Sequence, residues 1–185
     1  MDSIRLIAAI DLTAAEERAL HCITYELRSQ FKDGYAYDEG LYHITLHLFE
    51  ETPEEQLKNL QRVLKRAAAK QAPFTLVTGK PVIVGDPKCA AIWISLTDGQ
   101  DALFQLHDRL GKQLARAGFA VENITDPPHI TIGRYVDTTK FQASLDEETL
   151  PSMSLYAQAL TLLKRTIADG IPSYEPLFSV KFSGQ

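Results

Sequence analysis

The chain has 185 residues, of which 45% are hydrophobic and 23% charged, with a formal net charge of −5. This composition is that of an ordinary globular protein with enough apolar residues to form a core within one domain. The negative net charge argues against a protein that coats nucleic acid non-specifically, because that mode depends on many phosphate contacts from Lys and Arg, but a local basic site is compatible with it.

Strands and helices alternate along the first half of the chain. Short apolar, β-branched runs indicate buried strands, and apolar residues at three- and four-residue spacing indicate helices. Thr13 with Glu16 forms a capping box at the start of the first helix. In chain order we predict a strand at 4–12, a helix at 14–31, a Gly- and Asp-rich loop at 32–40, a strand at 42–49, a helix at 53–70 and a strand at 74–84.

The second half repeats this order and adds a final strand. In chain order we predict a strand at 90–99, a helix at 100–117, a loop at 118–128, a strand at 129–135, a weaker helix at 138–150, and strands at 156–165 and 176–182. We therefore predict one α+β domain at 1–185 with a bilobal duplicated fold, whose halves are roughly 1–85 and 86–185. In this fold two antiparallel sheets flank a central cleft, and the helices lie on the outside.

The tripeptide His-Ile-Thr occurs once in each half, and each copy lies in a predicted strand. Side chains alternate between the two faces of a strand. In the first copy we therefore expect His43, Thr45 and His47 to share one face, with the intervening apolar residues on the core face. In the second copy His129 and Thr131 share a face in the same way. Two lobes related by a pseudo-twofold axis would bring both polar faces to one groove.

Two imidazoles and two hydroxyls in one groove suit a phosphodiester. Histidines of near-neutral pKa can divide the proton transfers, one taking a proton from water and the other giving one to the leaving alkoxide. Threonine hydroxyls can donate hydrogen bonds to the non-bridging oxygens, whose charge grows during the attack. This chemistry needs neither a metal nor a cofactor. A lone strand histidine is more often structural, and the duplication in register with threonine is what favours a catalytic role.

The segments "RLIAAIDL", "HITLHLF" and "PPHITIGR" resemble the 2H phosphoesterase superfamily, in its branch of RNA 2′,3′-cyclic phosphodiesterases, also labelled 2′-5′ RNA ligases. The resemblance extends over nearly the whole chain, and the doubled H-x-T motif is specific for the superfamily. It implies that His43 and His129 are the catalytic pair and that Thr45 and Thr131 bind the phosphate.

The resemblance also implies that Arg134, which completes an H-x-T-x-x-R pattern in the second motif, contacts the phosphate. Alternation alone places Arg134 on the face opposite His129, so this role requires the strand to end or bulge near Gly133. The first motif has Leu48 in place of the arginine. The chain also has "LFEE" where "FLG" usually follows the first motif, which bears on the loop beside His43 and on substrate preference.

We therefore expect a metal-independent phosphodiesterase that hydrolyses the 2′,3′-cyclic phosphate at RNA or nucleotide ends to a 2′-phosphate. Two alternatives stay open. One is a 2H hydrolase of a small cyclic or 2′-5′-linked nucleotide metabolite, and the other is a nucleotide- or RNA-binding module without turnover. Tyr35, Tyr37 and Tyr42, just before the first motif, either stack a terminal base or pack the loop.

The expected partner is an RNA 3′ end or a nucleotide with a cyclic phosphate, with no membrane association and no obligate protein partner. Cys22 and Cys89 have no metal or redox spacing and do not suggest a secreted disulfide scaffold. The early run "LIAAI" is too short for a signal peptide or a membrane span. We expect a monomeric, cytoplasmic enzyme.

Overall fold

The computed structural model describes residues 3–31, 33–120, 126–141, 150–168 and 170–184. The strands are β1 (Ser3–Asp11), β2 (Tyr35–Ala36), β3 (His43–Pro53), β4 (Phe74–Val84), β5 (Ala90–Asp98), β6 (His129–Val136), β7 (Ser154–Ala157), β8 (Ala159–Ala168) and β9 (Ile171–Lys181). The helices are α1 (Ala14–Ile23), α2 (Tyr25–Arg28), α3 (Leu57–Ala68) and α4 (Gln100–Arg116), with 3₁₀ turns η1 (Glu54–Gln56) and η2 (Thr138–Lys140).

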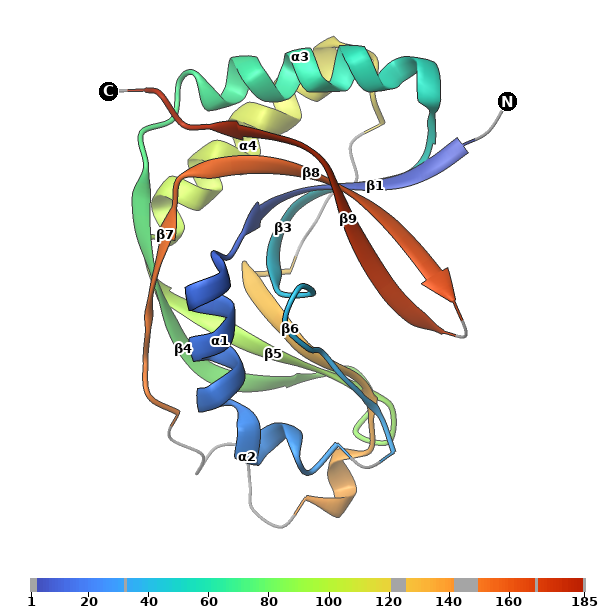
Figure 1. Cartoon of the computed structure of the whole chain (residues 1–185), viewed down its shortest axis with the longest axis vertical. Coiled ribbons are helices and arrows are strands. Elements are labelled where there is room, and N and C mark those ends of the chain that lie inside the picture. The colour runs from blue at the N-terminus through green and yellow to red at the C-terminus, as the bar shows by residue number, and fades with distance from the viewer. Residues whose placement is uncertain (1–2, 32, 121–125, 142–149, 169, 185) are drawn as a thin grey trace.

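The strands form one antiparallel sheet with the order β7-β4-β5-β6-β3-β1-β8-β9, and β2 lies beside β6. The sheet curls into a half-barrel (Figure 1). A single residue pair, Ile44 opposite Ile130, joins β3 to β6, so the sheet has two parts that meet at this point. The first part is β7, β4, β5, β6 and β2, and the second is β3, β1, β8 and β9. The two predicted sheets are thus joined through the central residues of the two His-Ile-Thr motifs, both of which are fully buried.

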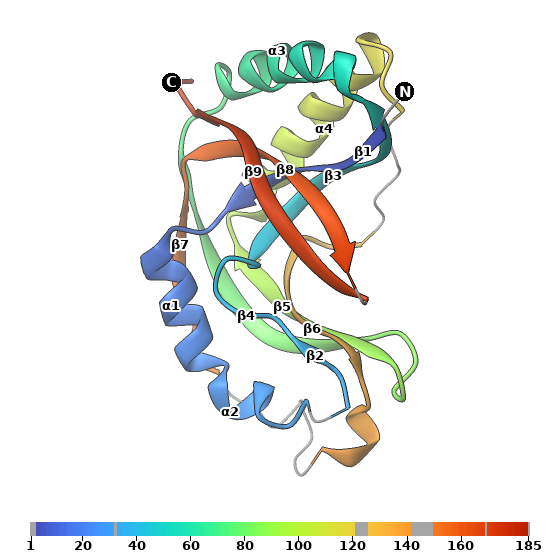
Figure 2. The same cartoon turned by 45° about the vertical axis from the view of Figure 1, so that its right-hand side comes forward.

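The helices cover the outer faces of the sheet, as predicted. α1 and α2 lie along the first part, whereas α3 contacts β8 and β9 and α4 contacts β3 (Figures 1 and 2). The predicted capping box starts α1, because the Glu16 N–H donates to Thr13 Oγ1 (3.3 Å) and the Thr13 N–H donates to the Glu16 carboxylate (2.7 Å). α4 buries the leucines of one stripe, which are Leu103, Leu106, Leu110 and Leu114. No helix of the described ranges is long and apolar enough to cross a membrane.

Several elements differ from the expectation. β2 lies within the predicted loop at 32–40, and β3 continues to Pro53, so the following helix begins later than predicted. The predicted strand at 156–165 is two strands, because the chain leaves β4, the partner of β7, and then pairs with β1 as β8. A continuous apolar pattern cannot show such a change of partner. Of the predicted helix at 138–150, the structure gives only the turn η2, and 142–149 lie outside the described residues.

Each part of the sheet draws strands from both halves of the chain. β4 belongs to the first half and pairs with β5 and β7 of the second, while β1 of the first half pairs with β8 of the second. The two parts of the sheet are therefore not the two halves of the sequence, and the proposed duplication at roughly 1–85 and 86–185 stays a prediction.

Candidate active site

A cavity of about 490 Å³ lies between the two parts of the sheet. His43 and Thr45 line it from β3, and His129, Thr131 and Arg134 line it from β6. The structure thus brings to one cavity all five side chains that the sequence assigns to the site. The two strands that carry them pair with each other through Ile44 and Ile130, the central residues of the two motifs.

A β-bulge follows the threonine of the first motif. Two consecutive residues of β1 pair with Thr45 and His47, which leaves Leu46 as the extra residue of β3. Paired residues share a face and consecutive residues alternate, so the bulge places His47 on the face opposite Thr45. The expectation that His47 shares a face with His43 and Thr45 is therefore wrong. His47 is 1% exposed and stacks on His107 of α4, with ring centroids 4.3 Å apart.

A second bulge lies at the same position of the second motif. Two consecutive residues of β5 pair with Thr131 and Gly133, which leaves Ile132 as the extra residue of β6. This irregularity brings Arg134 to the cavity face, and it confirms the bulge predicted near Gly133. A side chain at Gly133 would collide with Phe31, since a Cβ there would lie 2.6 Å from that ring.

The same local hydrogen bond orients both motif histidines. His43 Nδ1 lies 2.8 Å from the carbonyl oxygen of Leu41, and His129 Nδ1 lies 2.8 Å from that of Pro127. A carbonyl oxygen can only accept, so each Nδ1 carries a proton and donates it. In the neutral ring the lone pair is therefore on Nε2, and this is the nitrogen of each ring that can exchange a proton with a bound molecule.

Burial lowers the pKa of both motif histidines from the ordinary value of 6.5. The pKa of His43 falls to about 4, mainly because of burial and further because His129, Arg134 and Arg165 oppose a second positive charge. Burial also lowers the pKa of His129, and the carboxylate of Asp126 partly opposes that shift. Without a ligand both rings are therefore neutral near pH 7.

Aromatic side chains contact the two rings in different ways. The rings of His43 and Tyr174 make an edge contact, with centroids 4.4 Å apart. His129 lies flat on Trp93, with centroids 3.6 Å apart and planes 7° from parallel. Both aromatic residues line the cavity, so each imidazole has one packed side that limits its rotation.

Tyr37 forms a hydrogen bond with Arg134, and both residues line the cavity. The Arg134 Nε–H donates to the Tyr37 hydroxyl oxygen at 3.0 Å, and that hydroxyl lies 3.5 Å from the hydroxyl of Tyr174. Tyr37 and Tyr42 are 1% and 2% exposed and pack in the hydrophobic core, and Tyr37 also lines the cavity. Of the two interpretations that the sequence leaves open, packing is the one that their burial supports.

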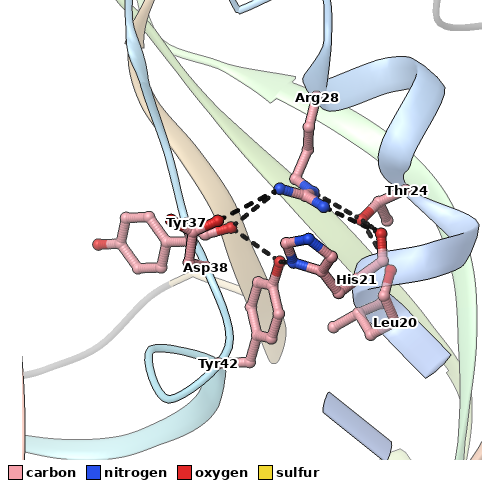
Figure 3. Close-up of polar contacts among 7 residues, drawn as sticks. All are labelled: Leu20, His21, Thr24, Arg28, Tyr37, Asp38 and Tyr42. Atoms are coloured by element: carbon pink, nitrogen blue, oxygen red, sulfur yellow. Dashed lines mark hydrogen bonds and ion pairs between the residues drawn. The ribbon is translucent and has the colours of Figure 1, made fainter. Parts of the chain in front are cut away.

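A hydrogen-bond network anchors Tyr37 to the first two helices (Figure 3). The Tyr37 carbonyl oxygen accepts from the Tyr42 hydroxyl at 2.8 Å and from Arg28 Nη1 at 3.4 Å. Arg28 also donates to the Thr24 hydroxyl at 3.1 Å and to the carbonyl oxygen of His21 at 3.0 Å. The position of Arg134 therefore depends on α1 and α2 through the backbone of Tyr37.

Three further residues that line the cavity lie outside the two motifs, and sequence reasoning did not assign them to the site. Trp93 comes from β5, Arg165 from β8 and Tyr174 from β9. Their places depend on strand pairing between distant segments, such as Trp93 opposite Thr131. Within the described ranges, no three His, Cys, Asp or Glu side chains gather closely enough to hold a metal ion. A metal-free reaction remains a prediction.

Comparisons with known proteins agree with one another. Residues 15–169 match the model of the 2′-5′ RNA ligase superfamily. The chain is 27% identical over 143 residues to an RNA 2′,3′-cyclic phosphodiesterase of Bacillus subtilis (strain 168), a match that covers 77% of each protein. It is 24% identical to one of Geobacillus stearothermophilus, over 95% of this chain and 56% of that protein. The apo structure of E. coli LigT superposes with a TM-score of 0.72 at 25% identity, over 98% of each chain.

Proposed function

The chain belongs to the 2′-5′ RNA ligase superfamily of phosphoesterases, and from this membership we propose that it hydrolyses 2′,3′-cyclic phosphates at RNA or nucleotide ends to 2′-phosphates. The observation that carries the proposal is the shared cavity, in which the histidine and threonine of both motifs meet and each histidine is held in the same tautomer. The names of the two curated relatives support the choice of substrate.

The two histidines carry the proton transfers. One of His43 and His129 takes a proton from water through Nε2 while the water oxygen bonds to phosphorus. The other gives a proton from Nε2–H to the 3′ oxygen as the bond between phosphorus and that oxygen breaks. Because Nδ1 of each ring is engaged with a carbonyl oxygen, both transfers use Nε2. Attack by a 5′ hydroxyl in place of water would form a 2′-5′ linkage through the same site.

The charge that develops on the non-bridging oxygens needs hydrogen-bond donors. Thr45, Thr131 and Arg134 supply two hydroxyls and a guanidinium at the cavity. Leu48 lines the cavity at the position of the first motif that corresponds to Arg134, so the two motifs together contribute one cation. The charge of that cation and the hydroxyl dipoles act without a metal.

Substrate binding itself favours protonation of the histidine that acts as the general acid. Both histidines are neutral near pH 7 in the unliganded protein, because burial lowers the pKa of each below 6.5. A phosphodiester anion in the cavity favours the protonated form of a neighbouring imidazole and raises its pKa again. The acid therefore takes up its proton together with the substrate.

We also propose that the enzyme acts in the cytoplasm as a single chain. Cys22 and Cys89 are free and exposed, as suits a reducing compartment. The five proposed site residues all line one cavity of this chain, which supports a site formed within one subunit.

Hydrolysis of two cyclic phosphates tests this function. The purified protein is incubated with adenosine 2′,3′-cyclic phosphate and with an oligoribonucleotide that ends in a cyclic phosphate, and the products are identified by ³¹P NMR. We expect 2′-phosphates from both. A 3′-phosphate product would contradict the proposed leaving group. Faster turnover of a 2′-5′-linked dinucleotide would support the metabolite hydrolase, and binding without any turnover would support the binding module.

A further inference from the structure

The cavity contains a second guanidinium besides Arg134. Arg165 of β8 lines the cavity, and its charge lowers the pKa of His43. Its partner across the β8–β9 hairpin is Tyr174, whose ring contacts the ring of His43. The hairpin therefore brings a cation to the His43 side of the cavity.

The charges around the two histidines are arranged asymmetrically. Arg165 affects His43, and the carboxylate of Asp126 affects His129. Arg134 acts on both rings and lies with the phosphate ligands of the second motif. If a substrate carries a second negative charge, the favoured orientation therefore places that charge on the His43 side of the cavity, toward Arg165 and away from Asp126.

Arg165 opposes the protonation of His43, so its charge does not help this ring to become an acid. The reacting phosphate already has donors from both motifs, in the two threonine hydroxyls and Arg134. Arg165 is half-buried beside these groups and matches another anion, since the planar set of N–H donors of a guanidinium fits two oxygens of a phosphate at once.

An RNA 3′ end carries such an anion next to its cyclic phosphate, in the phosphodiester attached to the 5′ oxygen of the terminal nucleotide. We propose that Arg165 binds this second phosphate and selects RNA ends and 5′-phosphorylated nucleotides over nucleosides that have a cyclic phosphate alone. This inference rests on the proposed function and names the substrate class of the same site.

Binding of two product analogues tests the role of Arg165 without any turnover. Calorimetry compares adenosine 2′-phosphate with adenosine 2′,5′-bisphosphate in the parent and in Arg165→Gln, Arg165→Lys and Lys164→Gln. Lys164 is the matched control, because it is the adjacent cation and its partner in β1 is the core residue Leu6. The quantity of interest is the affinity ratio of the two ligands, in which any effect of Arg165 on the 2′-phosphate cancels.

We expect the parent to bind the bisphosphate about ten- to a hundredfold more tightly, in line with a charge-assisted hydrogen bond. Arg165→Gln should bring the ratio close to one, Arg165→Lys should keep part of it, and Lys164→Gln should keep all of it. A parental ratio near one, or a ratio that Arg165→Gln leaves intact, would overturn the inference. An equal loss of both ligands would also overturn it, because Arg165 would then act on the reacting phosphate.

The proposed function is tested separately by turnover of adenosine 2′,3′-cyclic phosphate. If the parent hydrolyses it and the affinity ratio is one, only the role of Arg165 fails. If the parent hydrolyses neither this compound nor an RNA end, the proposed function fails, and the affinity ratio still decides whether the cavity holds a second phosphate.

Discussion

Burial of the two motif histidines predicts an acid-shifted, bell-shaped dependence of kcat/KM on pH. The profile of kcat/KM follows the ionisations of the free enzyme. The pKa of His43 is lowered from 6.5 to about 4, and that of His129 is also lowered from 6.5. One ring must be neutral and the other charged, so each contributes one limb. The maximum should therefore lie below pH 6.5, and kcat/KM should fall about tenfold for each pH unit above the higher pKa.

Removing either ring should remove its limb of the bell. His43→Ala and His129→Ala should each lower kcat/KM roughly 10²- to 10⁴-fold, which is the usual contribution of a positioned proton carrier. The limb that each substitution flattens identifies the base and the acid. The double variant should be little slower than the slower single variant, because groups that act in one concerted step are strongly non-additive.

The assay is the initial rate of hydrolysis of adenosine 2′,3′-cyclic phosphate from about pH 3 to about pH 8, a range that includes both the lowered pKa of His43, about 4, and the ordinary titration range of histidine. Circular dichroism at each pH restricts the comparison to folded protein. His47→Gln is the control, because His47 lies on the other face of β3 against His107 and should retain far more activity. Near-parental rates for both His43→Ala and His129→Ala, or a profile that stays level across this range, would refute the assignment of the site.

Four further predictions concern the absence of a metal, the two threonines, Tyr37 and His47. Excess EDTA should leave hydrolysis unchanged, and activity that only Zn²⁺ or Mn²⁺ restores would contradict a metal-free site. Thr→Ser at Thr45 or Thr131 should keep most activity, whereas Thr→Val should cost on the order of 10²-fold, and equal losses would point to packing in place of the hydroxyl. Tyr37→Phe removes the acceptor of Arg134 Nε and should lower kcat/KM about tenfold with little change in the pH profile. Burial lowers the pKa of His47 from 6.5 to about 4. The free energy of unfolding should therefore fall by about 3 kcal/mol as the pH drops from 6.5 to 4, and acid denaturation of His47→Leu should lack this loss.

The arrangement of the candidate site could be predicted from the sequence where the signal is local. His-Ile-Thr stands in an alternating run in both halves, and alternation alone separates the polar face from the core face. Gly133 marks the bulge that turns Arg134 to the cavity, because a glycine inside a strand is a recognised sign of one. Leu46 gives no such sign, so the matching bulge in β3 is missed and His47 is assigned to the wrong face.

The rest of the cavity depends on pairings between distant segments. Trp93 and Tyr174 contact the two motif histidines only because β5 pairs with β6 and the β8–β9 hairpin lies beside β1. The split of 156–165 into β7 and β8 has the same origin, since both strands are apolar and only their partners differ. Local periodicity reports which face is buried and contains no information on which strand lies next to it.

Two matching motifs raise a chemical question, because the general base must be neutral and the general acid protonated at the same pH. The bulges and the hydrogen bonds at Nδ1 are the same in both copies, so they orient His43 and His129 alike and cannot separate their roles. The surroundings differ first in burial, because His43 is buried more deeply than His129, and then in charge, with the positive charge of Arg165 near His43 and the carboxylate of Asp126 near His129. In the proposed mechanism, the repeated motif therefore sets the geometry of the two rings, and the residues around it that are not repeated set which ring is protonated.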